Sequence, residues 1–374
     1  MRVLADLRVP VAGGGVEDAW IAVDGERIVD VGRGAAPAGD AEPQGGLIAL
    51  PGFVDLHCHG GGGGAFTVGS TDEARAAAAL HLAHGTTTML ASLVTASRDD
   101  IEAGIDALAP LVDDGVLHGI HLEGPWISPA HPGAQQSAAI RALDTGELDA
   151  LLERGGGRIA MVTLAPELPG ALAAIPRIVA AGAVVAIGHT GADAATTTAA
   201  IDAGATLGTH LFNAMPPLHH RAPGPVGALL VDPRATVELI ADLHHVDPIV
   251  LALAIRAAGP DRVALVTDAI SAAGAGDGAL DLGGVPVVVE GGVARMRDGG
   301  ALAGSTLTLD AAVRGVVAAA GIDLADAARM AAGTPARVLG LDDRGTLAPG
   351  LRADIVLVDD ELAVRRVLRG GVDV

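Results

Sequence analysis

The sequence contains no Lys and no Tyr, and it has a single Cys, Cys58, among its 374 residues. All 24 residues in the Lys and Arg count are therefore Arg. Without Lys the chain has no Schiff-base lysine, no P-loop lysine and no lysine carbamate that could bridge two metal ions. A single Cys excludes an intramolecular disulfide framework and a metal site built from several cysteines.

Aromatic side chains and positive charge are also scarce. The chain has only 2 Trp and 3 Phe, too few for base-stacking platforms. A formal net charge of −21 and a pI near 4.8 argue against general binding of nucleic acid or anionic membranes. Apolar runs stay below the roughly 18 residues of a membrane span, and the first residues lack the apolar stretch of a signal peptide. We therefore expect a cytoplasmic enzyme.

From about residue 54 to residue 319, short β-branched runs alternate with Ala-rich stretches of helical period. This alternation is typical of βα units around a parallel sheet. The eight expected strands are Val54–His59, Thr87–Leu93, Val116–Glu123, Ile159–Leu164, Val184–His189, Ala205–Phe212, Thr236–Asp242 and Arg262–Asp268. The expected helices are Asp72–His84, Arg98–Leu111, Ser137–Glu153, Leu172–Ala181, Asp193–Ala203 and Asp247–Ala257. The pattern predicts an α/β fold, a TIM-like (β/α)₈ barrel.

The two chain ends differ from this pattern, because they show short strands separated by Gly turns. Neither end is long enough for a stable sheet, but the two together can form one small β-sandwich beside the barrel. We expect the β-domain to comprise residues 1–50 and 341–374, with the barrel over residues 51–340. A further β-like piece, Leu280–Met296, interrupts the barrel after its eighth strand.

Polar residues gather where the predicted barrel strands end, which is where barrel enzymes place their chemistry. The first strand ends in His57-Cys58-His59, and residues two apart in a strand share a side, so both imidazoles can face the barrel mouth. Other strand ends contribute Glu123, His189, His210 and Asp268. Neutral imidazole and carboxylate are standard ligands of divalent metals. The pattern therefore predicts a metal site at the mouth of the barrel.

Each of these residues also has an ordinary structural interpretation. A single His near a strand end is usually hydrogen-bonded within the fold, and Cys58 would then pack against the barrel wall as an apolar side chain. His121 shares a side of its strand with Glu123, which is compatible with support of a ligand or with a packed polar pair. The six residues together fall on five of the eight predicted strand ends, and this joint pattern favours the metal site.

Several longer motifs carry a resemblance to a known family. In chain order they are PGFVDLHCHGGGG (51–63), HLEGPWISP (121–129), IGHT (187–190), THLFNAMPPLHHRAPG (209–224), LIADLHHVD (239–247), LVTDA (265–269), LAGSTLTLD (302–310) and GTLAPGLRADIVLVD (345–359). Over nearly the whole chain, the sequence resembles the N-acetylglucosamine-6-phosphate deacetylase branch of the amidohydrolase superfamily.

The resemblance implies a role for each matched residue. Glu123, His189 and His210 match the principal metal ligands, and His57 and His59 match a second metal position that some members have. Asp268 matches the catalytic acid and base. The residues that match substrate contacts, chiefly to phosphate, are Asn213, Ala214, Arg221 and His245. The resemblance also implies a homodimer, in which Arg221 serves its own site or reaches the site of the neighbouring subunit.

Two positions depart from the family pattern. Gln135 stands where members usually have a His that contacts the sugar phosphate, and Leu243 stands where they usually have Gly. Gln135 can donate a hydrogen bond to the substrate but carries no positive charge, so a weaker affinity for the 6-phosphate is expected.

The predicted activity is metal-dependent hydrolysis of N-acetylglucosamine-6-phosphate to glucosamine-6-phosphate and acetate. The cofactor is one or two divalent ions per subunit, with zinc expected and iron or another ion as the alternative. An alternative activity is deacetylation of another N-acetyl amino sugar or sugar phosphate, such as N-acetylgalactosamine-6-phosphate. A metal-free, non-catalytic homologue and a cyclic-amide hydrolase or deaminase are less well supported. The only expected partners are the small-molecule substrate and a second copy of the chain.

Overall fold

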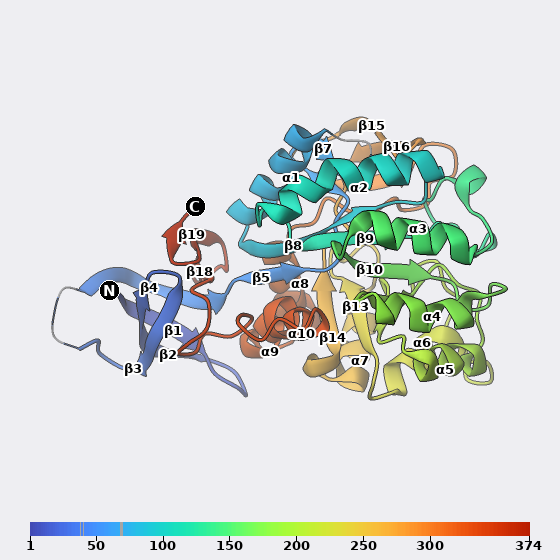
Figure 1. Cartoon of the computed structure of the whole chain (residues 1–374). Helices are drawn as coiled ribbons and strands as arrows, with labels where there is room; N and C mark the ends of the chain where they lie inside the picture. The colour runs from blue at the N-terminus through green and yellow to red at the C-terminus, as the bar shows by residue number, and fades with distance from the viewer. Residues whose placement is uncertain (38, 40, 68–69) are drawn as a thin grey trace.

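The structure, a computed structural model, describes residues 1–37, 39, 41–67 and 70–374. Its elements form two parts that lie side by side (Figure 1). The smaller part is a β-domain that contains both chain termini, and the larger part consists of strands surrounded by helices. Among the helices of these residues, none is long and apolar enough to pass through a lipid bilayer.

The larger part is built around eight parallel strands in the order β14-β13-β12-β11-β10-β9-β8-β5. They are β5 (Phe53–Asp55), β8 (Thr86–Leu93), β9 (Gly119–Glu123), β10 (Ile159–Leu164), β11 (Val184–Ile187), β12 (Leu207–Gly208), β13 (Thr236–Ile240) and β14 (Val263–Val266). The two edge strands meet just beyond their carboxyl ends, where Cys58 and Ala269 form a parallel bridge and the His59 amide donates to the Ala269 carbonyl at 2.7 Å. The predicted (β/α)₈ barrel is therefore confirmed.

Helices alternate with these strands and lie around the barrel (Figure 1). They are α1 (Thr71–Ala83), α2 (Arg98–Asp113), α3 (Thr145–Gly155), α4 (Ala171–Ala180), α5 (Ala194–Ala203), α6 (Gly224–Val231), α7 (Pro248–Ala258), α8 (Leu309–Ala320), α9 (Leu324–Ala328) and α10 (Thr334–Val338). Short helical turns add η1 (Ser137–Ala139), η2 (Pro260–Arg262) and η3 (Arg329–Gly333). Side-chain caps set several helix starts; the Ser97 hydroxyl, for example, accepts from the Asp100 amide at the start of α2.

The expected helix Ser137–Glu153 is wrong in its first half. Only the short turn η1 forms there, and α3 begins at Thr145. The Asp144 side chain explains this start, because it accepts hydrogen bonds from the amides of Gly146 and Glu147. The residues between β9 and α3 instead form a loop that brings Gln135 to the mouth of the barrel.

The β-domain is one seven-stranded sheet in the order β20-β19-β18-β4-β1-β2-β3. Its strands are β1 (Arg2–Pro10), β2 (Val16–Asp24), β3 (Arg27–Arg33), β4 (Ala41–Pro51), β18 (Ile355–Val358), β19 (Val364–Arg369) and β20 (Val372–Asp373). The long strand β4 joins the two chain ends, since it pairs with β1 on one side and with β18 on the other. Leu4, Ile21 and Leu357 belong to one buried cluster, so both ends share a core as predicted.

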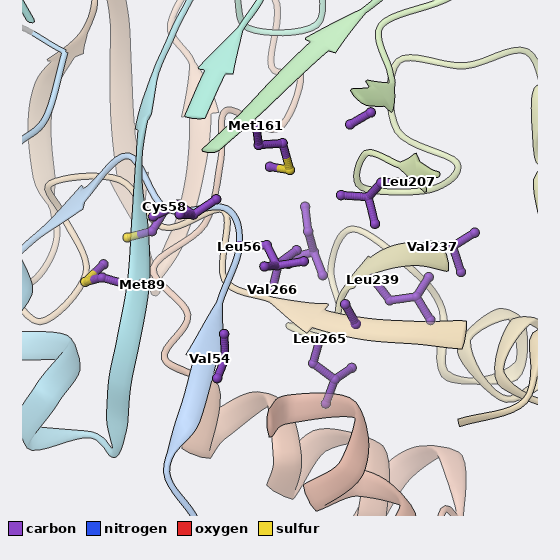
Figure 2. Packing of buried hydrophobic residues seen from close by; sticks show 14 of the residues in the cluster. Val54, Leu56, Cys58, Met89, Met161, Leu207, Val237, Leu239, Leu265 and Val266 are labelled. Carbon is purple, nitrogen blue, oxygen red and sulfur yellow. The ribbon is translucent and has the colours of Figure 1, made fainter. Parts of the chain in front are cut away.

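The barrel core is a larger apolar cluster, part of which appears in Figure 2. Leu56, Met161 and Val266 are fully buried in it and come from different strands or their ends. The expected β-like insertion after the eighth strand is also present, as β15 (Gly278–Leu282), β16 (Val285–Glu290) and β17 (Val293–Met296). It packs on residues at the barrel mouth and adds Leu282 to the wall of the cavity there. Two further short strands are β6 (Gly60–Gly61) and β7 (Gly64–Ala65).

Candidate active site

A cavity of about 290 Å³ lies at the carboxyl ends of the barrel strands. The residues that line it are His59, Val94, Glu123, Gly133, Ala134, Gln135, His189, His210, Asn213, Ala214, His245, Asp268, Leu282, Ala301, Leu302 and Gly304. Nearly all of them lie in loops that follow barrel strands, while Leu282 comes from the insertion. The wall is therefore polar on the barrel side and apolar on the side of the insertion.

Glu123, the last residue of β9, lies between two pairs of histidines. Its Oε1 is 3.1 Å from the Nε2 atoms of both His189 and His210 and 3.4 Å from His57 Nε2. Its Oε2 is 3.2 Å from His59 Nε2. All five side chains are at most 5% exposed. We call these five residues the metal-ligand cluster.

The outer nitrogens of three of these imidazoles fix their tautomers. Each Nδ1 lies 3.1–3.2 Å from a carbonyl or carboxylate oxygen, which accepts a hydrogen bond. The acceptors are the Glu238 carboxylate for His57, the Ser92 carbonyl for His59 and the His131 carbonyl for His189. Each Nδ1 therefore carries a proton, and Nε2 is the nitrogen that faces the cavity and would bind a cation after losing its own proton.

The Nε2 atoms of the four histidines lie in two close pairs. The Nε2 atoms of His57 and His59 are 3.0 Å apart, and so are those of His189 and His210. Two ring nitrogens this close crowd each other when both are neutral or both protonated, whereas a cation that displaces their protons would be attracted to both. The pairs His57–His59 and His189–His210 each form a group with Glu123 whose ligand atoms lie within 4.8 Å of one another. The donor set therefore fits one or two divalent metal ions.

The same arrangement keeps the carboxylates ionised. Burial would raise the pKa of Glu123, but His57, His189 and His210 lower it well below its usual range. Burial also opposes ionisation of Asp268, yet the adjacent His57 and His59 bring its pKa to about 2. Burial alone would lower the pKa of His57. When no metal is bound, the carboxylates of Glu123 and Asp268 instead raise it well above its usual value.

Asp268 follows β14 and lies beside the metal-ligand cluster. Its Oδ1 is 3.3 Å from His59 Nε2 and 3.5 Å from His57 Nε2, and the residue lines the cavity. Its backbone is in the left-handed region, with φ at 48°, as are His189 at 47° and His210 at 25°. Such conformations are costly for residues other than Gly and concentrate at functional sites, where packing holds them in place.

His121 is hydrogen-bonded beneath the cluster rather than exposed to the cavity. Its Nδ1 lies 2.8 Å from Ser92 Oγ, and its Nε2 lies 2.8 Å from Thr163 Oγ1. Its ring meets the His57 ring edge-on, with centroids 4.7 Å apart. Of the two interpretations that the sequence left open, this arrangement has features of both, since His121 is a packed polar group that also supports a ligand.

Glu238, on β13, is a supporting residue that the sequence analysis missed. Its Oε2 lies 3.2 Å from His57 Nδ1 and accepts from the His210 amide at 3.1 Å, so one carboxylate contacts both halves of the cluster. It is fully buried. The only signal in the sequence is an acidic residue within an otherwise apolar strand, Val237-Glu238-Leu239-Ile240.

The residues assigned to the substrate fall into two groups. Asn213, Ala214, His245 and Gln135 line the cavity, whereas Arg221 does not. Arg221 is on an exposed loop, with its guanidinium 2.7 Å from His220 Nε2, and it borders a separate hollow beside α5 and α6. Within one chain, the structure thus brings together every predicted site residue except Arg221.

His245 is the cavity residue best placed to carry positive charge for a phosphate. Its Nδ1 lies 2.7 Å from Asp242 Oδ2. Burial alone would lower the pKa of His245, but the Asp242 carboxylate raises it above the usual value. Leu243, at the departure from the family pattern, has φ at 65°, a conformation that suits the usual Gly better.

The Gln135 side chain points toward the metal-ligand cluster. Its Nε2 donates to Glu123 Oε2 at 2.6 Å, and its Oε1 accepts from the Thr95 amide at 2.7 Å. Both ends of its side chain are therefore engaged by the protein, on the floor of the cavity.

Comparison with known proteins agrees with this geometry. The N-acetyl-D-glucosamine-6-phosphate deacetylase of Mycobacterium smegmatis is 46% identical, with a TM-score of 0.96 and 100% of both chains covered. A mutant of it in complex with N-acetyl-D-glucosamine-6-phosphate gives a TM-score of 0.95 at 46% identity, covering 100% of this chain and 98% of that one. The N-acetylgalactosamine-6-phosphate deacetylase of Escherichia coli O157:H7 is 41% identical over 326 residues, or 86% of each chain. Residues 48–372 match the Amidohydrolase family, and the chain therefore belongs to that family.

Proposed function

We propose that this protein is a metal-dependent deacetylase that hydrolyses N-acetylglucosamine-6-phosphate to glucosamine-6-phosphate and acetate. The observation that carries the proposal is the ionised Asp268 carboxylate, 3.3 Å from a ligand nitrogen of the metal-ligand cluster and open to the cavity. The substrate is supported by the M. smegmatis relative, whose mutant is in complex with this sugar phosphate. The His and carboxylate ligands suit zinc.

A divalent ion held by the metal-ligand cluster would lower the pKa of water in the cavity and polarise the amide carbonyl. Asp268 is ionised and can accept a proton from the water while the water oxygen bonds to the carbonyl carbon of the amide. When the C–N bond breaks, the same carboxyl group returns that proton to the leaving amine. The products are acetate and the free amino sugar, so one side chain serves first as base and then as acid.

The phosphate end of the substrate needs local positive charge, because the chain as a whole carries a net charge of −21. His245 supplies it from the cavity wall, with Asn213 and the backbone at Ala214 as neutral contacts. Arg221 lies outside the cavity of its own chain. The functional unit is accordingly a homodimer in which a second copy brings its Arg221 to the phosphate. The proposed location of the enzyme is the cytoplasm.

A second substrate has a specific observation in its favour. The E. coli relative at 41% identity acts, by its name, on N-acetylgalactosamine-6-phosphate, which differs from the first substrate in the orientation of one hydroxyl group. Parallel measurements of kcat/KM for the two sugar phosphates and the two free N-acetyl sugars decide between them. A higher value for the galactosamine compound would replace the first substrate with the second.

The mechanism is tested with Asp268→Asn, which keeps the shape of the side chain but removes its basicity. Turnover should fall by about 10²–10⁴-fold, the range for loss of a general acid–base group. Metal content, measured by elemental analysis, should stay at the wild-type value, which separates loss of chemistry from loss of the ion. Wild-type turnover in this variant would refute the role of Asp268.

A further inference from the structure

The loop after β9 holds Gln135 in one position. Its backbone N–H donates to the Pro132 carbonyl at 3.1 Å, which closes a turn, and the residue is only 7% exposed. Gly133 lies so close to His189 that a Cβ on it would be 2.9 Å from the ring. The loop therefore packs directly on the metal-ligand cluster, and Gln135 is fixed between β8 and β9 rather than free to follow a substrate.

The orientation of the Gln135 amide follows from its neighbours. The Thr95 backbone N–H can only donate, so the atom 2.7 Å from it must be Oε1. The opposite atom is then Nε2, which donates to Glu123 Oε2 at 2.6 Å. A hydrogen bond from an amide to an ionised carboxylate is short and strong. The side chain thus spans the gap from the backbone after β8 to the shared ligand.

This bond makes the two oxygens of Glu123 unequal. Oε1 is contacted by His57, His189 and His210, while Oε2 is contacted by His59 and by Gln135. One lone pair of Oε2 is used by the amide, so the carboxylate cannot rotate without breaking that bond. Residues that orient a ligand in this way commonly govern metal affinity.

We propose that Gln135 is a positioning residue that locks Glu123 between the two histidine pairs, and that it takes no part in holding the sugar phosphate. This reverses the substrate contact expected from the sequence. The reason is geometric, because one N–H of the side-chain amide is bound to the Glu123 carboxylate and the amide oxygen is bound to the Thr95 amide. The amide is thereby held against a negatively charged carboxylate, a position that repels a phosphate. The part of the inference that concerns phosphate rests on the proposed deacetylase function, whereas the part that concerns metal binding does not.

Gln135→Met tests the proposal, because it keeps the length and volume of the side chain and removes both hydrogen bonds. Zn²⁺ affinity, measured by competition with a chromophoric chelator, should fall by about 10–100-fold. The visible spectrum of the Co²⁺-loaded protein should change as well. The ratio of kcat/KM for N-acetylglucosamine-6-phosphate to that for free N-acetylglucosamine should stay within about twofold of wild type.

Gln136→Met is the matched control, because that neighbouring side chain lies against Gly284 of the insertion instead of Glu123. It should leave both metal affinity and the Co²⁺ spectrum unchanged. If the Gln135→Met variant is poorly folded by circular dichroism, Gln135→Glu replaces it, since it keeps the acceptor for the Thr95 amide and must still change the Co²⁺ spectrum.

Unchanged Zn²⁺ affinity together with a lower preference for the phosphorylated sugar would overturn the proposal and make Gln135 a phosphate contact. Unchanged affinity, spectrum and preference would overturn it too. Failure of the wild-type protein to deacetylate either sugar would refute the proposed function, while the comparison of metal affinities would stand.

Discussion

Two groups of potential metal ligands both include residues in or just after β5, and they differ in where their protons and hydrogen bonds lie. One is the metal-ligand cluster, to which this segment contributes His57 and His59. The other consists of Asp55, Cys58 and His81, whose ligand atoms also lie within 4.8 Å of one another. We call it the Cys58 cluster. Both are buried and rich in residue types that bind metals, so composition alone does not distinguish them.

The Cys58 cluster is complementary in its hydrogen bonds. His81 Nε2 lies 3.0 Å from the Gly60 carbonyl and so carries the ring proton, and Cys58 Sγ donates to the same carbonyl at 3.4 Å. Thr267 donates its hydroxyl to Asp55 at 2.6 Å. Burial raises the pKa of the Cys58 thiol well above its usual value and lowers the pKa of His81. The thiol and the imidazole are thus neutral and share one carbonyl, and the Asp55 carboxylate is bound by Thr267, so within the described part of the chain only His81 Nδ1 of this cluster is left without a partner. The three side chains are directed at the protein rather than at a common cation.

In the metal-ligand cluster, three imidazoles carry a proton on Nδ1, the ring nitrogen that faces away from the cavity. The acceptors of His57, His59 and His189 hold a proton on Nδ1 and direct Nε2 toward the cavity, where the Nε2 atoms lie in pairs 3.0 Å apart. The comparison teaches that the supporting oxygens, rather than the number of His or Cys residues, distinguish the cluster that we propose as the metal site. Of the three predictions that follow, the first and the last test this distinction, and the second tests a carboxylate that supports another residue of the cavity.

The largest effect is expected for Glu123→Gln, which removes the charge shared by both ligand groups. A neutral amide binds a divalent ion far less well than a carboxylate does. Turnover should therefore fall by more than about 100-fold, the upper end of the loss for residues that only support a ligand. Bound metal per chain should fall with it. Both are measured on the same sample, by elemental analysis and acetate release. Retention of the wild-type metal content would contradict the central position of Glu123.

An intermediate effect concerns His245, whose pKa is raised by Asp242. The cationic ring that we propose for the phosphate site therefore persists to a higher pH than usual and is lost as the pH rises through the raised pKa. In Asp242→Asn, that loss should begin at lower pH. KM for the phosphorylated sugar at intermediate pH should therefore rise relative to wild type.

KM for free N-acetylglucosamine serves as the control for this pH profile, since it should not depend on the charge of His245. Identical KM profiles for the phosphorylated sugar in wild type and Asp242→Asn would remove His245 from the phosphate site.

The smallest effect on activity is expected for Cys58→Ala, on the other side of the comparison. Metal content and turnover should stay within about twofold of wild type, because the thiol is neutral and bound to the protein rather than to an ion. Stability should fall by about 1–2 kcal/mol through lost packing and weak hydrogen bonds. Urea unfolding measures the latter. Loss of the metal from this variant would erase the distinction between the two clusters.

The barrel and the grouping of most candidate ligands at its mouth could be predicted from the sequence, because both depend on local patterns. Strands and helices alternate at short range, and ligands such as His57 and Glu123 occur where strands end. The joint β-domain could be predicted for a related reason, since neither chain end can bury a core by itself.

The supporting contacts could not be predicted, because they join distant parts of the chain. Glu238 meets His57 across 181 positions of sequence, and nothing local to either residue indicates the pairing. Gln135 was assigned to the substrate by its place in a motif, whereas the Thr95 amide that orients it comes from another loop. The start of α3 was missed because the cap at Asp144 outweighed the helical composition before it.

The central claim is that the metal-ligand cluster holds the divalent ion on which deacetylation depends. The most direct test is a titration of Zn²⁺ into chelator-treated protein, with acetate release from N-acetylglucosamine-6-phosphate measured at each step. The account predicts that the metal-free protein is inactive and that turnover rises with added ion to a plateau at one or two equivalents per chain. Full turnover in the verified metal-free protein would contradict it.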